Sequence, residues 1–298
     1  MKIVVSGASG LIGTALTKAA SRLGHTVTPL TRTPTAGLPG IEWNPSAGIL
    51  NAQALEGFDA VVHLAGESIA AGRWTAAQKK RILDSRVQGT RLLSSTIAQL
   101  KRRPSVLVSA SAVGFYGDCS DRLLREESPP GNDFLANVCR EWEQATEPAS
   151  KAGIRVVHLR SGMVLAKEGG ALPKMLLPFK MGVGGKIGSG KQYMSWIDLE
   201  DEVSVIQHCI SRDSIRGPVN SVGPSPVTNL EFTKTLGRVL SRPTIFPLPA
   251  PMARILLGEM ADGLLLSSQR AVPSALIAEG FNFRHPNLEE ALRRILSS

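Results

Sequence analysis

Short apolar runs alternate with amphipathic stretches over the first 165 residues. Residues 2–6 form a β-branched run typical of a buried parallel strand. A glycine-rich turn follows, and apolar residues between Leu11 and Leu23 then recur at helical spacing until Gly24, the expected helix stop. Repeated strand–helix units of this length predict a parallel sheet covered on both faces. We expect further strands at residues 27–30, 59–66, 105–109 and 154–159, and helices at 78–100 and around 137–149.

The pattern changes beyond Leu165. Glycine and proline are dense between Gly169 and Gly190, which predicts loops that cross over a cleft. Residues 185–191 match part of a P-loop, but we reject that site because Gln192 replaces the magnesium-binding Ser or Thr and a strand, not a helix, is expected next. Helical runs at 230–240, 252–257 and 288–296, separated by proline-marked connections, predict a smaller lobe.

The turn after the first strand has the spacing G-x-x-G-x-x-G, formed by Gly7, Gly10 and Gly13. Glycines permit a tight turn and let a pyrophosphate approach the backbone, and the helix that follows directs free N–H groups at the anion. The spacing differs by one residue from the G-x-G-x-x-G dinucleotide fingerprint, and alone it also fits a purely structural turn. Its place between a strand and an amphipathic helix favours nucleotide binding.

The second predicted strand ends in Thr31 and Arg32. Dinucleotide domains that prefer NAD usually carry an acidic residue there, whereas an arginine accommodates the 2′-phosphate of NADP. No acid lies beside Arg32, so we predict NADP(H) as the cofactor, although a surface arginine after a strand would give the same pattern.

These patterns predict an α/β fold: a Rossmann-type doubly wound parallel sheet with a smaller C-terminal α+β lobe. We expect residues 1–165 to form the NADP-binding domain, with residues 190–225 returning to it. Residues 166–189 and 226–298 are expected to form a substrate-binding or cap lobe.

Composition restricts the class of protein. A chain of 298 residues with 43% apolar and 20% charged residues is typical of a soluble globular protein. No apolar run approaches the roughly 20 residues of a membrane span, and a first strand at Lys2 leaves no room for a signal peptide. We therefore expect a cytoplasmic protein with no membrane partner. The five histidines are scattered, as are Cys119, Cys139 and Cys209, so we predict no metal site.

The net charge of +9 indicates anionic partners. The basic runs are short and lie on or beside predicted helices, where a solvated face explains them. Aromatic residues make up only 5% of the chain, which leaves little material for stacking bases. We therefore expect no nucleic-acid partner, and a phosphorylated cofactor accounts for part of the charge.

Several segments resemble the extended short-chain dehydrogenase/reductase superfamily, its nucleotide-sugar epimerases in particular. The matching segments are the glycine turn, Leu64-Ala65-Gly66, Val87-x-Gly89-Thr90, Ser109 to Gly117, Arg160-Ser161-Gly162 and residues 192–201. More similar still is an atypical branch known only as an epimerase family, with its own C-terminal lobe of unknown function. The segments shared with that branch are Ala65-Gly66-Glu67, Arg73-Trp74, Ser85-Arg86, Trp142-Glu143 and Gln269 to Pro273.

The resemblance covers essentially the whole chain and implies where the cofactor lies. Arg86 replaces the asparagine of the superfamily's Asn-Val-x-Gly-Thr pattern, which puts an extra cation beside the expected cofactor. The expected cofactor contacts are Gly7, Ser9, Gly10, Leu11, Ile12, Gly13, Thr31, Arg32, Leu64, Ala65, Gly66, Glu67, Arg86, Ser109, Gly162 and Met163.

The superfamily's catalytic Tyr-x-x-x-Lys dyad does not occur in this sequence. The chain has two tyrosines, and the residues four positions after them are Ser120 and Ile197. Residues 134–139, where the dyad would fall, are apolar. In the superfamily the tyrosine is the acid/base and the lysine lowers its pKa, but neither Phe134 nor Leu135 can transfer a proton.

Two hydroxyl groups remain as candidate catalytic groups. Ser111 matches the superfamily's catalytic serine if one residue is inserted before Tyr116; without the insertion Ala112 takes that place. Tyr116 is the other nearby proton donor, although packing at the end of the strand explains it equally well. The nearby charged residues are Glu67, Arg86 and Arg160. We expect them either to polarise a substrate or to form ion pairs around the cofactor.

Two functions fit these observations. The first is an NADP(H)-binding epimerase-like or reductase-like enzyme with a non-standard acid/base. It would act, as a monomer or homodimer, on a small molecule held between the sheet and the lobe. The second is a non-catalytic NADP(H)-binding protein that signals the state of the cofactor to a partner. The loops expected over a cleft favour the first function, and the missing dyad favours the second.

Overall fold

A computed structural model gives the structure of residues 1–34 and 40–297. Its centre is an eight-stranded sheet in which neighbouring strands are parallel, except for the antiparallel edge pair β3–β4. The strand order is β12 (Gly217–Ser221), β8 (Arg155–Ser161), β6 (Val106–Ala112), β5 (Ala60–His63), β1 (Lys2–Ser6), β2 (Thr26–Thr31), β3 (Ile41–Asn44) and β4 (Ile49–Leu50).

The apolar runs form central strands because both faces of the sheet are covered. On β1, Ile3 and Val5 pack into one hydrophobic core, and Val4 packs into the core on the opposite face. Successive side chains of a strand point to opposite faces, so burial on both sides requires an unbroken apolar run. Fully burying one such side chain contributes roughly 1.5–3 kcal/mol.

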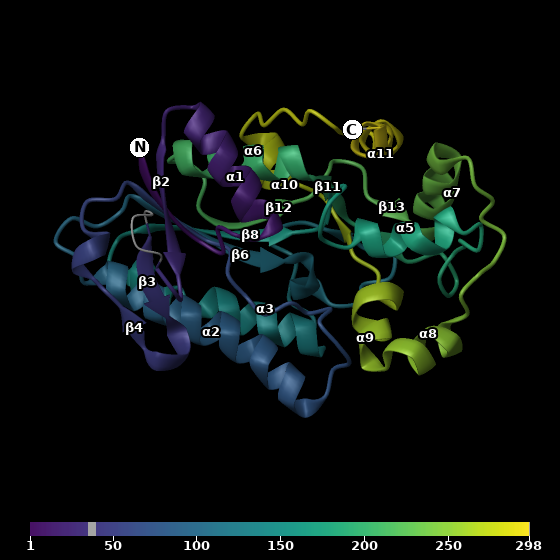
Figure 1. The fold of residues 1–298 in the computed structure, drawn as a ribbon, viewed down its shortest axis with the longest axis horizontal. Helices are drawn as coiled ribbons and strands as arrows, with labels where there is room; N and C mark the ends of the chain where they lie inside the picture. Colours follow the sequence, from purple (N-terminus) through teal and green to yellow (C-terminus); the bar gives the residue numbers. More distant parts are fainter. Residues whose placement is uncertain (35–39, 298) are drawn as a thin grey trace.

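Helices cover both faces of the sheet, as expected from the strand–helix alternation (Figure 1). One face carries α1 (Leu11–Arg22), α6 (Leu199–Ser211) and α10 (Ser274–Ala278). The opposite face carries α2 (Ala76–Ala98), α3 (Phe134–Gln144) and α4 (Glu147–Lys151). The predicted doubly wound α/β fold is therefore confirmed.

The order of the strands reverses beside β1. The chain adds β2 and β3 on one side of β1 and then β5, β6 and β8 on the other. Ligands of open α/β sheets bind at such a reversal, outside the carboxyl ends of the strands. Ser6 is aligned with Leu30 on β2 and with His63 on β5. The residues that come next in each segment, which are the glycine turn, Thr31 and Leu64, therefore lie together at this edge of the sheet.

The C-terminal lobe is mostly helical and lies at one end of the molecule (Figure 1). Its core includes Trp196, Phe232 and Leu236, which are almost completely buried. No helix in the described residues is long and apolar enough to cross a bilayer. The elements in and beside the lobe are α5 (Leu172–Lys180), α7 (Asn229–Leu240), α8 (Ala250–Leu257), α9 (Glu259–Ala261), α11 (Leu288–Ser297) and the pairs β9 (Met163–Leu165) with β11 (Trp196–Asp198) and β10 (Tyr193–Met194) with β13 (Val227–Thr228).

One segment assigned to the lobe from sequence lies instead on the sheet domain. β14 (Arg270–Ala271) pairs with β7 (Leu123–Leu124), and Leu276 of α10 joins the core under the sheet. Asn220 on β12 also donates from Nδ2 to the carbonyl of Val272 at 2.9 Å. An apolar pattern shows that a segment is buried, but it does not show which core the segment enters. The expected lobe boundary at residue 226 therefore misses that the segment containing β14 and α10 packs on the sheet domain.

The helix expected around residues 137–149 is two helices. α3 begins earlier, at Phe134, because the Asp133 carboxylate caps it by accepting a hydrogen bond from the N–H of Ala136 at 2.8 Å. The α4 helix starts separately with Pro148 in its first turn, a position that proline favours. The strands β3 and β4 were not predicted from sequence.

Glu202 on α6 is a completely buried carboxyl group below the ends of β8 and β12. The hydroxyl of Ser161 donates to its Oε1 at 2.6 Å, and that of Ser221 donates to its Oε2 at 2.5 Å. Burial raises the pKa of Glu202 to about 7, against the lowering effect of the two hydrogen bonds. The carboxyl therefore titrates near neutral pH.

We predict that Glu202→Gln becomes progressively more stable than the wild type as the pH rises. The folded-state pKa of about 7 exceeds the ordinary value of 4.5, so the folded protein holds this proton more tightly than the unfolded chain. This contribution to stability is complete below the ordinary pKa and is lost as the pH rises through the folded-state pKa. Urea unfolding from about pH 5 to about pH 8 measures the change, which reaches about 3 kcal/mol at most.

The control is Glu127→Gln, which alters an exposed carboxylate. Its stability relative to the wild type should not change with pH over that range. Parallel pH profiles for the wild type and Glu202→Gln would contradict the assignment.

Candidate functional site

The glycine turn brings three backbone segments into close contact. A Cβ atom on Gly13 would lie 2.2 Å from the carbonyl oxygen of Gly7, and one on Gly7, whose φ is +70°, would lie 3.0 Å from the nitrogen of Ala65. Gly10 is exposed, and a Cβ there would meet only the Gly7 oxygen, at 3.3 Å. Gly7 and Gly13 are thus required by the packing, whereas Gly10 keeps the backbone accessible.

The N-terminus of α1 carries free N–H groups. Its N-cap residue, Gly10, supplies no side-chain acceptor, whereas Thr75 and Asp198 cap α2 and α6 with their side chains. Within the described residues, no group accepts a hydrogen bond from the N–H of Leu11 or Ile12. These donors and the positive end of the helix dipole form an anion-binding position.

A cleft of about 310 Å³ opens over this helix terminus. Val164, Gly170 and Ala171 line its far side and were not predicted as contacts, although the glycine density after residue 169 predicted a loop over a cleft. Gly170 has a φ of +70°, and a Cβ there would lie 3.3 Å from the side chain of Leu11. The expected cofactor residues that line the cleft are Gly7, Gly10, Leu11, Ile12, Gly13, Leu64 and Met163.

Thr31 is the last residue of β2 and Arg32 follows it, beside the glycine turn. The Arg32 side chain is exposed, and it makes no ion pair or hydrogen bond with residues 1–34 or 40–297. Ser9 is also exposed, at the outer side of the turn. The guanidinium of Arg32 is thus available to an anionic ligand.

Residues Ala65 to Glu67 are held in place by α2. The N–H of Glu67 donates to the hydroxyl of Ser85 at 3.0 Å, and Nη1 of Arg86 donates to the Glu67 carbonyl at 2.9 Å. Arg86 also lies over the ring of Trp142, 4.9 Å from its centroid, and burial lowers its pKa. The cation expected beside the cofactor therefore positions this loop, and Gly66 leaves space for it, because a Cβ there would lie 3.2 Å from Cζ of Arg86.

His63 joins the ends of β1 and β5 to the middle of α2. Its Nδ1 lies 2.6 Å from the Ser6 hydroxyl and its Nε2 lies 2.9 Å from the Thr90 hydroxyl. Complete burial lowers the pKa of His63 to about 4, so the ring is neutral at physiological pH. His63 is therefore a packing residue within the sheet. Ser109, its register partner on β6, is buried as well.

Gly162 and Met163 lie where the chain passes from β8 to β9. A Cβ on Gly162 would lie 2.6 Å from the carbonyl oxygen of Ser195, which also accepts a hydrogen bond from the N–H of Met163 at 2.8 Å. This contact fixes Met163 at the wall of the cleft.

Ser111 and Tyr116 belong to one buried hydrogen-bond network centred on Arg160. The Arg160 guanidinium forms a bidentate ion pair with Glu143, at 2.8 and 2.9 Å, and Ser111 donates to Oε1 of the same carboxylate at 2.7 Å. The Tyr116 hydroxyl donates to Oδ1 of Asn220 at 2.6 Å and accepts from Nη1 of Arg160 at 3.1 Å. Neither Glu143 nor Asn220 was predicted as a site residue.

The network determines what these two hydroxyl groups can do. Tyr116 is 1% exposed and Ser111 is 5% exposed. Burial raises the pKa of Tyr116, against the lowering effect of Arg160, whereas a tyrosine acid/base works with a lowered pKa. The geometry gives both residues a positioning role, and a direct catalytic role for either remains a prediction.

The place expected for the dyad is an apolar contact between α3 and the short turn η3 (Val113–Tyr116). A Cβ on Gly114 would lie 3.4 Å from Cβ of Leu135 and 3.9 Å from Sγ of Cys139. Burial raises the pKa of Cys139 to about 12, so its thiol stays protonated. Neither Leu135 nor Cys139 supplies an acid or base at neutral pH.

A second cavity, of about 300 Å³, lies between the start of α3 and the segment around α9. Its polar lining is mainly acidic, and its one cation, Arg254, pairs with Asp262 at 2.8 Å. Glu259 in turn pairs with Lys79 at 2.5 Å. The residues that line this cavity include Trp74, Asp118, Asp133, Phe134, Leu135, Arg254, Glu259 and Asp262.

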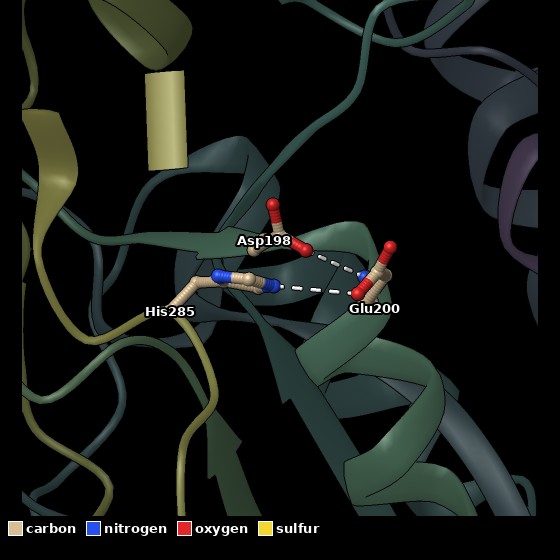
Figure 2. A group of neighbouring side chains, drawn as sticks. All are labelled: Asp198, Glu200 and His285. Carbon is tan, nitrogen blue, oxygen red and sulfur yellow. Dashed lines mark hydrogen bonds and ion pairs between the residues drawn. The ribbon is translucent and has the colours of Figure 1, made fainter. Parts of the chain in front are cut away.

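Asp198, Glu200 and His285 form a cluster between α6 and the C-terminal segment (Figure 2). Their nearest ligand atoms all lie within 4.8 Å of one another. Arg294 already pairs with both carboxylates, at 2.5 Å from Asp198 and 2.8 Å from Glu200. The cluster therefore joins α11 to α6 by ion pairs.

The matches to known proteins cover the chain from end to end. Residues 3–222 match the NAD dependent epimerase/dehydratase family, and residues 248–295 match a domain of unknown function, DUF1731. The chain is 46% identical over 290 residues to the epimerase family protein Mb2239 of Mycobacterium bovis, across 97% of this chain and 96% of that protein. It is 38% identical over 302 residues to the epimerase family protein YfhF of Bacillus subtilis, across 100% of this chain and 98% of that protein.

A solved structure agrees with the fold described above. The crystal structure of the human epimerase family protein SDR39U1 with NADPH has a TM-score of 0.92 and 35% identity, and the match covers 100% of both chains. The resemblance expected from the glycine turn and the strand ends is thus confirmed, and this chain belongs to the NAD-dependent epimerase/dehydratase family.

Proposed function

We propose that this protein binds NADP(H) in the cleft between the glycine turn and the segment from Val164 to Ala171. The observation that carries the proposal is the uncapped N-terminus of α1, which opens into that cleft at the strand reversal. The pyrophosphate would accept hydrogen bonds from the free N–H groups beside Gly10. The human relative crystallised with NADPH, 35% identical over the whole chain, supports this assignment.

Arg32 would select NADP(H) over NAD(H). Its guanidinium is exposed at the end of β2 and is unpaired within the described ranges, so it is free to form charge-assisted hydrogen bonds to a 2′-phosphate. The second arginine expected beside the cofactor, Arg86, is committed to the carbonyls of Glu67 and Ile82. Of these two arginines, only Arg32 is therefore available for the phosphate.

The bound cofactor would supply hydride chemistry, and the acidic cavity beside α3 would hold a small-molecule substrate. Four carboxylates line that cavity, and its arginine is already paired with Asp262. A nucleotide sugar brings a pyrophosphate that such a lining repels. An uncharged or cationic small molecule fits better, with proton transfer by a group other than a Tyr–Lys dyad. The exposed carboxylates of Asp118 and Asp133 are the candidates that line the cavity.

The second function, a non-catalytic NADP(H)-binding protein, is favoured by a different observation. The hydroxyl groups of Ser111 and Tyr116 are both engaged in the Arg160 network. If no other group transfers protons, the site binds the cofactor without turnover. The two functions share the cofactor site and differ in whether any substrate is converted.

Gly10→Val should abolish NADPH binding and leave the fold intact. The residue is exposed, so a side chain there obstructs the approach of a pyrophosphate without meeting the core. Titration calorimetry with NADPH and a thermal melt measure the two effects. Gly72→Ala is the matched control, because a Cβ there meets nothing within 4 Å. Unchanged NADPH affinity in folded Gly10→Val would refute the placement of the pyrophosphate.

Arg32→Ala should weaken NADPH binding by roughly tenfold to a hundredfold and leave NADH binding almost unchanged. A hydrogen bond to a charged partner contributes about 1.5–3 kcal/mol, and NADH has no 2′-phosphate to lose. Parallel titrations of both cofactors against wild type, Arg32→Ala and Arg32→Lys measure the selectivity. A wild type that binds NADH as tightly as NADPH shows that Arg32 has no such role.

Tight NADPH binding should occur with little or no activity on nucleotide sugars. General acid–base groups typically contribute about 10² to 10⁴ in rate, and the residues of this cofactor cleft are separate from any such group. The test is a panel of UDP- and GDP-sugars, monitored by NADPH absorbance and by sugar-nucleotide interconversion, beside a binding titration. Robust epimerisation by the wild type would contradict the proposal, and Ser111→Ala and Tyr116→Phe would then identify the acid/base.

A further inference from the structure

The positive charge of this protein is concentrated in two segments of the lobe. Residues 169–197 and 232–258 contain eight of the 34 basic residues and none of the 25 acidic residues. The rest of the chain is therefore nearly neutral, at +1, and these segments carry +8 of the net charge of +9. A cofactor phosphate bound at Arg32 does not explain this charge, because Arg32 lies outside both segments.

Most of these cations have no acidic partner in the part of the chain that the structure describes. Arg238 pairs with Glu289 at 2.9 Å and Arg254 pairs with Asp262 at 2.8 Å. The other six form no ion pair with any residue that the structure describes, and they are Lys174, Lys180, Lys186, Lys191, Lys234 and Arg242.

The same two segments expose large apolar side chains. We call five of them the apolar ridge: Leu177, Met181, Val183, Ile245 and Phe246, which are between 47% and 72% exposed. Leu177 and Met181 are one helical turn apart, at the end of α5. An exposed cluster of large apolar side chains marks an interaction surface.

The two segments run side by side, which brings the two parts of the apolar ridge close together. Nε of Arg242 donates to the carbonyl of Lys180 at 3.3 Å, and the N–H of Phe246 donates to the carbonyl of Gly184 at 3.3 Å. A further bond, from the N–H of Leu248 to the carbonyl of Lys186, measures 2.9 Å. Figure 1 shows α5, α7 and the connection after α7 at the end of the molecule opposite β2, β3 and β4.

We propose that the apolar ridge and its flanking cations dock this protein on an anionic phospholipid surface. The exposed side chains of Leu177, Ile245 and Phe246 would enter the boundary between headgroups and acyl chains. Lys180 and Arg242 would remain at the phosphate level, because long basic side chains extend toward the aqueous side. Binding of this kind combines buried apolar area with attraction between basic residues and anionic headgroups.

The surface fits a bilayer better than a second copy of this chain or a nucleic acid. In a two-fold symmetric dimer the same patch meets itself, so the unpaired lysines of both copies would face each other. Nucleic-acid surfaces are read by polar and stacking groups, whereas the centre of this patch is mainly aliphatic. The sequence-based expectation of no membrane partner rested on the absence of a spanning segment, and peripheral docking needs none.

The experiment is co-sedimentation of the full-length protein with vesicles of two compositions. One is phosphatidylcholine alone, and the other is equal parts phosphatidylcholine and phosphatidylglycerol. The wild type should bind the second, bind the first weakly, and dissociate as salt is added. Lys180→Glu should lower the partition coefficient about tenfold to thirtyfold, because it changes the charge by two at the surface. Ile245→Ser combined with Phe246→Ser should lower it at least as much.

Two variants at the other end of the molecule are matched controls. Leu23→Ser removes an apolar side chain that is 62% exposed on the sheet domain, and Lys18→Glu reverses an exposed charge on α1. Both should bind the vesicles as the wild type does.

Failure of the wild type to bind phosphatidylglycerol vesicles would overturn the proposal, as would equal losses in the control variants. A dimer in light scattering that Ile245→Ser with Phe246→Ser dissociates would assign the ridge to a second copy instead. Titration of the same variants with NADPH tests whether the cofactor cleft is intact. A variant that loses vesicle binding but binds NADPH normally shows that the ridge acts independently of the cofactor site.

Discussion

The close approach of backbone segments at the reversal of strand order is the constraint on which the rest of this structure depends. A Cβ on Gly13 would lie 2.2 Å from the Gly7 oxygen, so α1 can begin directly above β1 only if that position has no side chain. His63 ties the adjacent strand ends and α2 together through the Ser6 and Thr90 hydroxyls. Because this packing fixes the N-terminus of α1 without a side-chain cap, the helix presents unsatisfied donors to the cleft.

A second rigid centre controls what chemistry the strand ends can perform. The buried ion pair of Arg160 with Glu143 engages Ser111 and Tyr116, and Tyr116 continues the network to Asn220 on β12. Removing one partner of a buried pair leaves an uncompensated charge, so such networks hold their geometry strongly. The hydroxyl groups of Ser111 and Tyr116 hold the strand ends together, so they are not readily available to transfer protons to a ligand. In the proposed function, cofactor binding and any turnover would therefore depend on different parts of this molecule.

The lobe differs from the sheet domain in charge as well as in architecture. Its two acid-free segments carry nearly all of the net charge, while the cavity beside α3 is lined mainly by carboxylates. Burial of the lobe core around Phe232 and Leu236 uses only the inner faces of α5 and α7. Their outer faces expose Leu177 and Lys180 on α5 and Lys234 on α7. In the two proposals, the basic outer surface and the acidic cavity would bind different kinds of ligand. Attraction to an anionic surface and selection of a substrate can thus act independently.

The sequence by itself determined the doubly wound sheet, the glycine turn, the position of Arg32 and the absence of a Tyr-x-x-x-Lys motif. Each follows from local pattern, because strand burial on both faces requires apolar runs and a tight turn requires glycine. Only the tertiary structure decided that Arg86 holds a loop, that Ser111 and Tyr116 share a network with Glu143, and that residues 270–281 return to the sheet domain. These facts depend on contacts between residues far apart in the chain. The periodicity of a sequence indicates that a side chain is buried. The hydrogen-bond and ion-pair partners of that side chain are determined only when the helices and strands pack together.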